Sequence, residues 1–378
     1  MHTKRKSRRP ARHHGTNLIY TAIAAAFLMV AGVVFFGQNA RAADLGGNCC
    51  ADLEERIAEL EATAARKGNR KVSLTVYGSV NEALTVIRAD GQSERRIVSN
   101  QIDPTKFGMT GSGKTGFGAV GFQIEVGIGA DHSDLTIRES RVWIETVAGR
   151  VDLGHTTTAA KDVAAMSVAN TVVASKMLSL APHNGTVGIP DVGYNDGRAD
   201  LVKWTSPVFG GFVASASWQA ASDAWDVALR WSGEAIGFKG AAGIGYVRTG
   251  GLEYAAGSAS LMHVATGVFV NGAIGQPTAG QATKLNVQHM TWQVQGGLER
   301  NVGLGGATTA FAEYGQAGDA TLISGVGFVP TDGVKFYGAG LVQAIDAGAL
   351  DLYASWRRYE APSAPSTDVM MVGGRVRF

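Results

Sequence analysis

KFGMTGSGKTGFGAVGFQIEVGIG, residues 106–129, decides between two folds. Its first part, GMTGSGKT (108–115), matches the phosphate-binding pattern G-x-x-x-x-G-K-[ST] at every position. In a nucleotide-binding protein such a loop opens a helix, whose N-terminus helps to bind the phosphates. Here the following residues include Gly116, Gly118, Gly121, Gly127 and Gly129. Because glycine disfavours helix interiors, the P-loop interpretation lacks its helix.

The residues after the motif alternate with a period of two. Val120, Phe122, Ile124 and Val126 are apolar, and the residues between them are small or polar. Alternation of this kind is typical of a half-buried strand. KFGMTG (106–111), which includes the start of the motif, alternates in the same way. The sequence therefore predicts a hairpin whose turn lies at 112–116, where Gly-Ser-Gly can supply positive φ angles.

The composition also favours a protein of many strands. The 378 residues include 51 Gly and 9 Pro, and 17% of them are charged. Frequent glycine suits short strands joined by turns and argues against a protein built from long helices.

The first 42 residues have the features of a secretory signal peptide. Six basic residues precede an uncharged apolar run, NLIYTAIAAAFLMVAGVVFFG, and Ala40-Arg41-Ala42 offers an A-x-A cleavage site. The alternative is a retained membrane helix, because about 20 apolar residues can span a bilayer. With seven basic residues removed in the leader, 27 basic groups would face 32 acidic ones. The basic leader therefore gives no reason to expect nucleic acid as a partner.

Residues 43–71 are predicted to form a short periplasmic coiled coil. Its seam would comprise Cys50, Leu53, Ile57 and Leu60, spaced three or four residues apart. About two heptads do not make a stable helix alone, so the pattern implies oligomerisation. Cys49 and Cys50 could form interchain disulfides in an oxidising compartment, or remain idle thiols on a linker.

From residue 72 to 378, short alternating segments continue without a long helical pattern. Segments such as SRVWIET (140–146), GRVDLG (149–154) and LVKWTS (201–206) place apolar side chains on one face and charged ones on the other. Lipid outside and water inside an outer-membrane barrel explain both faces. At about 19 residues per strand and loop, this length predicts about 16 antiparallel transmembrane strands in an all-β fold.

Two further features concern the order of the strands. Residues 88–104 are predicted to form an outer loop between the first two strands. A connection of about 40 residues, 158–198, follows the predicted fifth strand, and a structureless loop of that length in a compact domain is often functional. Its first half, DVAAMSVANTVVASKMLSL, is unusually apolar and is expected to pack against the barrel wall or a neighbouring subunit.

Several segments together resemble the porins of α-proteobacteria, especially the rhizobial group. They are residues 48–84, the hairpin 106–126, VKWTSPVFGGFVASASW (202–218) and the terminal VGGRVRF (372–378). The resemblance implies a 16-stranded outer-membrane barrel that is usually trimeric, is surrounded by outer-membrane lipid, uses no cofactor and passes small hydrophilic solutes and ions. The final strand closing on Phe378 also resembles the signal that barrel-assembly machinery recognises.

In this family the loop after the fifth strand enters and narrows the lumen, with acidic side chains facing basic groups on the wall. Rings of charge in such a place select ions by sign. The candidate constriction residues are Asp162, Asp191 and Asp196 on the loop and Arg141, Arg150, Lys203, Arg230 and Arg357 on the wall.

The competing hypothesis is an outer-membrane barrel with an enzymatic or adhesive role. The histidines after the leader, His132, His155, His183, His263 and His289, show no spacing that predicts a catalytic set, and no His/Cys pair has zinc spacing. We therefore expect a channel in the outer membrane of a Gram-negative bacterium, with no catalytic residues and no metal site.

Overall fold

A computed structural model describes residues 72–178, 194, 197–279, 287–323, 327–362 and 364–378. The chain divides into two compact units, Met1–Gly68 and Asn69–Phe378, and the described residues belong to the second. The predicted leader, the seam residues Cys50, Leu53, Ile57 and Leu60, and the loop residues Asp191 and Asp196 lie outside the described residues.

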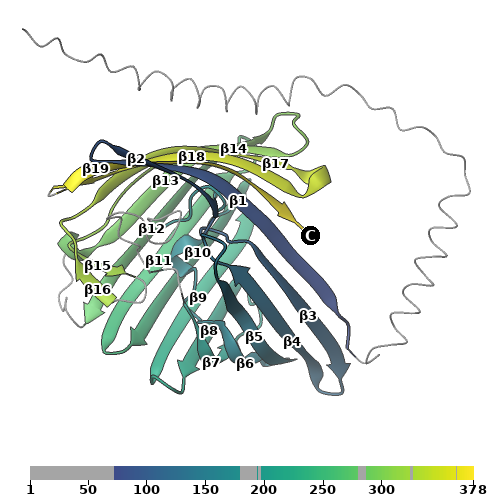
Figure 1. Cartoon of the computed structure of the whole chain (residues 1–378). Helices are drawn as coiled ribbons and strands as arrows, with labels where there is room; N and C mark the ends of the chain where they lie inside the picture. The colour runs from purple at the N-terminus through teal and green to yellow at the C-terminus, as the bar shows by residue number, and fades with distance from the viewer. Residues whose placement is uncertain (1–71, 179–193, 195–196, 280–286, 324–326, 363) are drawn as a thin grey trace, which may run out of the picture. The chain divides into compact units, whose positions relative to one another are not determined.

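The second unit is a sheet of antiparallel strands in which most neighbours in sequence are neighbours in space (Figure 1). The strands of this sheet are β1 (Thr75–Ala89), β2 (Gln92–Ser99), β3 (Lys106–Thr115), β4 (Gly118–Ile128), β5 (Leu135–Thr146), β6 (Gly149–Thr157), β7 (Arg198–Thr205), β8 (Phe212–Gln219), β9 (Ala224–Ala235), β10 (Phe238–Thr249), β11 (Leu252–His263), β12 (Val268–Ala279), β13 (Thr291–Asn301), β14 (Ala307–Gln316), β17 (Lys335–Ile345), β18 (Leu350–Ala361) and β19 (Ala364–Arg377). A separate hairpin, β15 (Ala320–Ile323) with β16 (Gly327–Pro330), lies between β14 and β17.

Pairing of the first strand with the last closes the sheet into a barrel. β1 and β19 run antiparallel from Ser79↔Arg377 to Ala89↔Thr367. At the seam, the backbone N–H of Gly78 donates to the carbonyl of Phe378 at 2.9 Å, and the N–H of Phe378 donates back at 3.1 Å. A closed sheet has no unpaired edge, which is why barrels can span a bilayer.

Two of the seventeen strands share one position in the wall, so the described residues form a 16-stranded barrel. β2 pairs with the second half of β1, from Glu82↔Ser99 to Ala89↔Gln92, and β3 pairs with the first half, from Thr75↔Thr110 to Ser79↔Lys106. The predicted strand number is therefore confirmed.

The predicted outer loop at 88–104 is wrong. β1 and β2 are joined by a two-residue turn at Asp90 and Gly91, whose φ angles are 48° and 73°. Two successive positive φ angles match the right-handed twist of the strands on either side, and Asp-Gly is a preferred pair for such a turn. The interruption lies instead at 100–105, between β2 and β3.

The predicted turn at 112–116 is also wrong, because GMTGSGKT lies within β3. The connection to β4 is Gly116-Phe117, with Thr115 opposite Gly118. A Cβ at Gly108 would lie 2.7 Å from the hydroxyl of Tyr77, and one at Gly111 would lie 2.5 Å from the ring of Phe122. These two glycines therefore allow aromatic side chains to cross the strand. No helix follows the motif, so its P-loop interpretation fails.

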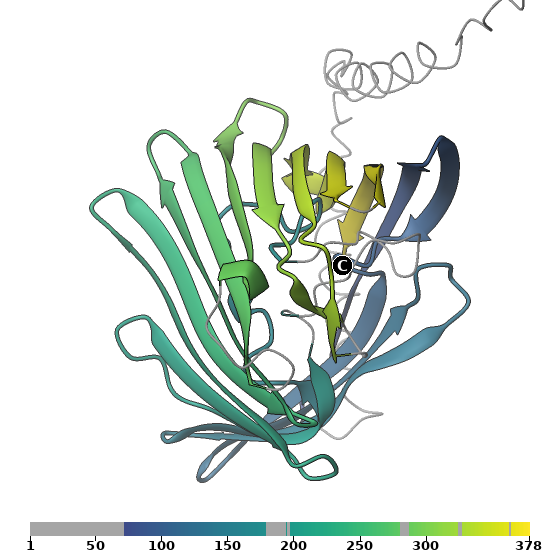
Figure 2. The same cartoon turned by 90° about the vertical axis from the view of Figure 1, so that its left-hand side faces the viewer.

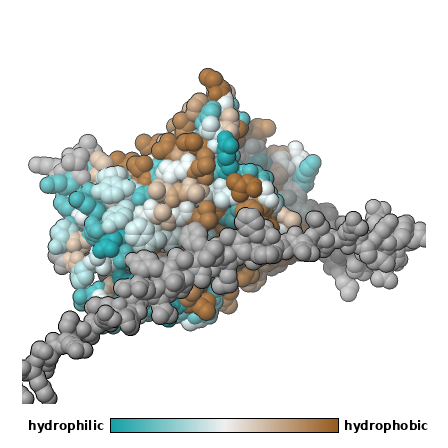
Figure 3. All heavy atoms as spheres, turned by 90° about the horizontal axis from the view of Figure 1, so that it is seen from above, coloured by the Kyte–Doolittle hydropathy of each residue, from teal (hydrophilic) through white to brown (hydrophobic). Residues whose placement is uncertain are grey.

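The outward face of the strands is apolar, as the alternation predicted. Outward side chains such as Val76, Val142, Leu153 and Val202 are 40–58% exposed. Figure 3 shows hydrophobic side chains over the middle of the barrel's surface and hydrophilic ones toward the end at left. Among the described residues, no helix is long and apolar enough to cross a membrane.

The closing seam generates a first prediction. A Cβ at Gly78 would lie 2.6 Å from the ring of Phe378 and 2.7 Å from the carbonyl oxygen of Lys106. We expect Gly78→Ala to destabilise the barrel by about 1–3 kcal/mol through overpacking, and to lower the temperature at which the folded band converts to the unfolded band on gels. Gly116→Ala is the matched control, because its Cβ would have no neighbour within 4 Å. Equal conversion temperatures for the two variants would contradict this description of the seam.

Candidate functional site

Residues 158–178, which follow β6, lie inside the barrel (Figure 2). They contain one short 3₁₀ helix, Val163–Ala165. Val163, Ala164, Val173 and Leu178 are at most 1% exposed. They pack with apolar side chains of the barrel wall and of the residues after β14, namely Ala228, Tyr254, Ala256, Ala273, Phe269, Phe311, Ala317 and Phe336. The apolar half of this loop therefore packs against the wall of its own barrel.

Serine side chains of β11 bind the backbone of the first part of the loop. Ser258 Oγ donates to the carbonyl of Val163 at 2.7 Å and accepts from the N–H of Met166 at 2.9 Å. Ser260 Oγ accepts from the N–H of Val168 at 2.9 Å. The loop does not form the regular backbone hydrogen bonds of a strand. These hydroxyls therefore pair with backbone groups that would otherwise be buried without a partner.

The second part of the loop is held by strands farther along the wall. The N–H of Asn170 donates to Glu299 Oε2 at 2.7 Å, and the N–H of Leu178 donates to Gln293 Oε1 at 2.8 Å; both acceptors are on β13. Asn100, in the interruption between β2 and β3, donates to the carbonyl of Val173 at 2.9 Å. The loop thus follows the wall from β9 to the interruption between β2 and β3.

Arg357 and Arg230, two predicted constriction residues, bind this loop. Arg357 Nε donates to Glu313 Oε1 at 2.7 Å, and its Nη2 donates to Ser175 Oγ at 2.7 Å. Arg230 Nη2 donates to the carbonyl oxygens of Ala159 at 2.7 Å and of Lys161 at 2.5 Å. Both side chains therefore hold the loop in place, a role that alternation along one strand does not reveal.

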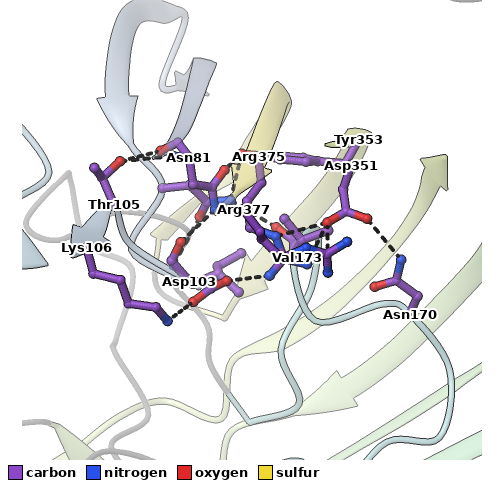
Figure 4. A network of polar contacts seen from close by, with 12 residues as sticks. Asn81, Asp103, Thr105, Lys106, Asn170, Val173, Asp351, Tyr353, Arg375 and Arg377 are labelled. Atoms are coloured by element: carbon purple, nitrogen blue, oxygen red, sulfur yellow. Dashed lines mark hydrogen bonds and ion pairs between the residues drawn. The ribbon is translucent and has the colours of Figure 1, made fainter. Parts of the chain in front are cut away.

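A second polar network lies where the loop meets the closing seam (Figure 4). Asp351 accepts from Arg375 at 2.6 and 3.0 Å and lies 3.4 Å from Arg377. Arg375 also contacts Asp103, which pairs with Lys106 at 2.7 Å. Ion pairs therefore connect β18, β19 and the 100–105 interruption on the inner side of the seam.

Arg141 and Arg150, also predicted for the constriction, share one carboxylate. Asp152 is 1% exposed, accepts from Arg150 at 2.8 Å and contacts Arg141. The guanidinium of Arg150 lies 4.4 Å from the ring centroid of Trp143, a cation–π distance. These side chains occupy the inner face of β5 and β6, away from the strands that bind the loop. Arg141 and Arg150 remain partly exposed, whereas Gln293 and Gln295 on β13 are 0% exposed.

Lys203 on β7 binds the end of β6. Its Nζ donates to the carbonyl of Thr157 at 2.8 Å and to the hydroxyl of the same residue at 3.0 Å. Close by, Arg198 lies 3.7 Å from Glu139, which also pairs with Arg141 at 3.4 Å. The wall from β5 to β7 is therefore a continuous strip of charge.

Asp162 pairs with lysines of its own loop. Its Oδ1 lies 2.6 Å from Lys176 Nζ and 3.5 Å from Lys161 Nζ. Burial inside the barrel raises the pKa of Asp162, but the two ammonium groups outweigh it, and the pKa lies below the ordinary aspartate value. Asp162 therefore stays ionised and neutralises part of the lysine charge rather than facing a wall arginine directly.

The lumen-facing charges near β5–β7 are mainly positive. On β5–β7 and the described part of the loop, the basic side chains of this face are Arg138, Arg141, Arg150, Arg198, Lys203, Lys161 and Lys176, and the acidic ones are Glu139, Glu145, Asp152 and Asp162. Lys161, Lys176 and Arg198 were not predicted as site residues. Their position within or at the end of a long lumen loop is the sequence signal that could have identified them. No group of three potential metal ligands occurs in the described part of the chain.

Comparisons with known proteins agree with this geometry. A family profile described as Gram-negative porin matches residues 25–377. No curated protein sequence matches significantly. Similar solved structures include the anion-selective porin from Comamonas acidovorans, with 16% identity, a TM-score of 0.55, and coverage of 81% of this chain and 100% of that one. A Rhodopseudomonas blastica porin triple mutant has 14% identity, a TM-score of 0.53 and coverage of 81% and 100%. OmpT of Vibrio cholerae in a trimer form has 12% identity, a TM-score of 0.53 and coverage of 81% and 99%.

A closed 16-stranded barrel with a charged interior and an inserted loop defines a transmembrane channel protein. The family match covers most of the chain, so the chain belongs to the Gram-negative porin family. It is an outer-membrane protein that forms a passive diffusion channel.

The loop anchors generate a second prediction. In Arg357→Met, Glu313 would remain buried without its cation, so we expect the barrel to lose about 3–5 kcal/mol of stability. The freed Ser175 segment should also raise the noise of the single-channel current. The double variant Arg357→Met/Glu313→Gln removes both charges and is expected to recover most of the stability. The measurements are thermal conversion on gels and current traces; a single variant as stable and quiet as the wild type would contradict the anchoring role.

Proposed function

We propose that this porin passes small hydrophilic solutes and prefers anions over cations. The observation that carries this proposal is the excess of basic over acidic side chains on the inner face of β5–β7 and on the facing loop. A ring of charge selects ions by sign, because counter-ions are concentrated and co-ions are depleted beside it. Asp162 and Asp152 each contact two basic side chains, so neither compensates the full basic charge around it.

The position of the loop supports a single open passage. Residues 158–178 cover the inner face of β9–β14, where side chains such as Asn271, Gln293 and Thr309 are 0% exposed. The inner face of β4–β6 retains partly exposed side chains, including Gln123, Arg141 and Arg150. Solutes would therefore cross between the loop and the β4–β7 wall. The anion-selective name of the Comamonas structure agrees with this proposal.

Aromatic side chains mark the part of the wall that would face lipid. Outward-facing pairs occur toward one end of β9–β18, with ring centroids 5.5–5.7 Å apart: Trp225 with Tyr246, Trp292 with Tyr314, and Tyr337 with Trp356. Aromatic girdles lie at the two membrane interfaces of barrels.

Toward the same end of β1, β2 and β4–β6, the described outward residues are aliphatic or polar, including Leu84, Ile97, Leu135 and Leu153. We propose that this second sector contacts other copies of the chain in a trimer.

The remaining sequence-based assignments are part of the same proposal. Residues 1–42 would be a cleaved signal peptide, 43–71 a periplasmic coiled coil supporting a trimer, and 72–378 the barrel. Origin in an α-proteobacterium, the constriction role of Asp191 and Asp196, and an assembly signal at Phe378 belong to it as well. A channel without enzymatic activity accounts for the lumen charges. The adhesin and enzyme alternatives have no specific observation in their favour.

The proposal predicts opposite effects for two changes in one cluster. Replacing Arg141 and Arg150 by Ala should shift the reversal potential in a KCl gradient toward cations, because two positive charges are lost from the passage. Asp152→Asn should shift it toward anions, because both guanidinium groups are then uncompensated. Lys114→Ala is the control and should leave conductance nearly unchanged, because Lys114 is exposed at the end of β3 beside the Gly116-Phe117 turn.

Planar-bilayer recordings of the purified protein provide the measurement. Absence of stepwise conductance would reject the channel itself. Reversal potentials that do not separate the arginine variant from Asp152→Asn would reject the role of this cluster in selectivity.

A further inference from the structure

A small cavity lies between the start of the loop and the inner face of β7–β9. Its volume is about 220 Å³, room for several water molecules at about 30 Å³ each. Lys161, Lys203 and Arg230 provide its positive charge, and hydroxyl groups such as those of Thr205 and Ser215 complete a polar lining. The chemistry of this lining is that of a site for a small anion with several acceptor atoms.

Among the described residues, two of the three cations have no carboxylate partner. Lys203 is 9% exposed and donates to Thr157 alone, through its carbonyl and hydroxyl oxygens. Arg230 donates to Ser215 Oγ at 3.2 Å and to two loop carbonyls. Within the described residues, neither lies within 4.0 Å of an acidic oxygen. A buried charge that contacts only neutral oxygens attracts a counter-ion.

The one acidic side chain that lines the cavity is already engaged. Asp162 Oδ1 lies 2.6 Å from Lys176, which is outside the lining, as well as 3.5 Å from Lys161. Asp226, deeper in the wall, accepts from Ser217 and from the N–H of Ala160. Among the described residues, neither carboxylate therefore pairs directly with Lys203 or Arg230.

Unused donors point to an oxyanion rather than to a spherical ion. Lys203 carries three N–H groups, two of which are accounted for, and the Nε–H of Arg230 donates to no described atom. These donors, together with the hydroxyl of Thr205, approach from two elements, β7 and β9, while the hydroxyl of Ser215 on β8 donates to the carbonyl of Ala159 at 3.3 Å and helps to orient Arg230. An anion with several oxygens can accept from both strands, whereas a halide presents a single centre.

We infer that this cavity binds a small tetrahedral oxyanion of the phosphate or sulfate type, between the inserted loop and β7–β9. The inference rests on the proposed function, because the anion would reach the cavity from the water-filled lumen. Such a site would raise the local concentration of the oxyanion and would slow other anions while it is occupied.

The test is the chloride current of reconstituted channels with inorganic phosphate added at constant ionic strength and pH. We expect phosphate to reduce the chloride conductance in a saturable way. Lys203→Gln should raise the half-blocking concentration about tenfold, because one charge-assisted hydrogen bond is lost. Lys203→Arg keeps the charge and should retain the block, and Lys114→Gln, on β3, is the matched lysine control and should behave as the wild type.

The outcomes separate the site from the channel. A chloride conductance that does not respond to phosphate or sulfate, or an equal response of Lys203→Gln and Lys114→Gln, would overturn the site and leave the porin function standing. No chloride current in the wild type would reject the channel itself. If Lys203→Gln does not fold, as heat-shifted gel mobility would show, Ser215→Ala provides the second variant. Its expected effect is a severalfold weaker block, and an unchanged block would count against the site.

Discussion

Pairing of β1 with β19 closes the sheet and leaves neither strand with an edge exposed to lipid. In hydrocarbon, an unpaired N–H or C=O costs several kcal/mol, so an open sheet edge is not tolerated. Pairing from Ser79↔Arg377 to Ala89↔Thr367 removes both edges at once. It also fixes the register of β1, so that Val76 and Val80 face outward while Ser79 and Asn81 face inward. A slip of one residue would exchange these two faces.

Closure also encloses a space inside the barrel, and the inserted loop fills part of it. A wall of this circumference encloses space that needs water or polypeptide, and residues 158–178 occupy part of it. Apolar side chains of the loop, such as Val163 and Val173, pack against the wall. Backbone groups of the loop form hydrogen bonds with the side chains of Ser258, Ser260 and Gln293 on the wall. Because the wall supplies both the apolar and the polar contacts, the loop is fixed on one side. The charged strip on β5–β7 is left facing it.

The sequence predicts the features that depend on neighbours along one strand. Alternation identifies outward Val142 and Val202 and inward Arg141 and Lys203, and chain length predicts the number of strands. Neither alternation nor chain length identifies contacts between distant strands. The turn was predicted too early, at 112–116, and the contacts of Gly108 and Gly111 were not foreseen, because the crossing rings of Tyr77 and Phe122 lie on other strands. The anchoring contacts of Arg230 and Arg357 likewise depend on the path of the loop across β9 and β18, far away in sequence.

We propose that the loop covers one half of the lumen wall and leaves the other half open. The most direct test is the accessibility of single cysteines, in a Cys49→Ser/Cys50→Ser background, to a charged thiol reagent during current recording. We expect Arg150→Cys to react quickly and to change the current, since Arg150 is partly exposed on the open side. Gln295→Cys should not react, since Gln295 is 0% exposed. Equal reaction at both positions, or reaction at Gln295→Cys alone, would contradict this division of the lumen wall.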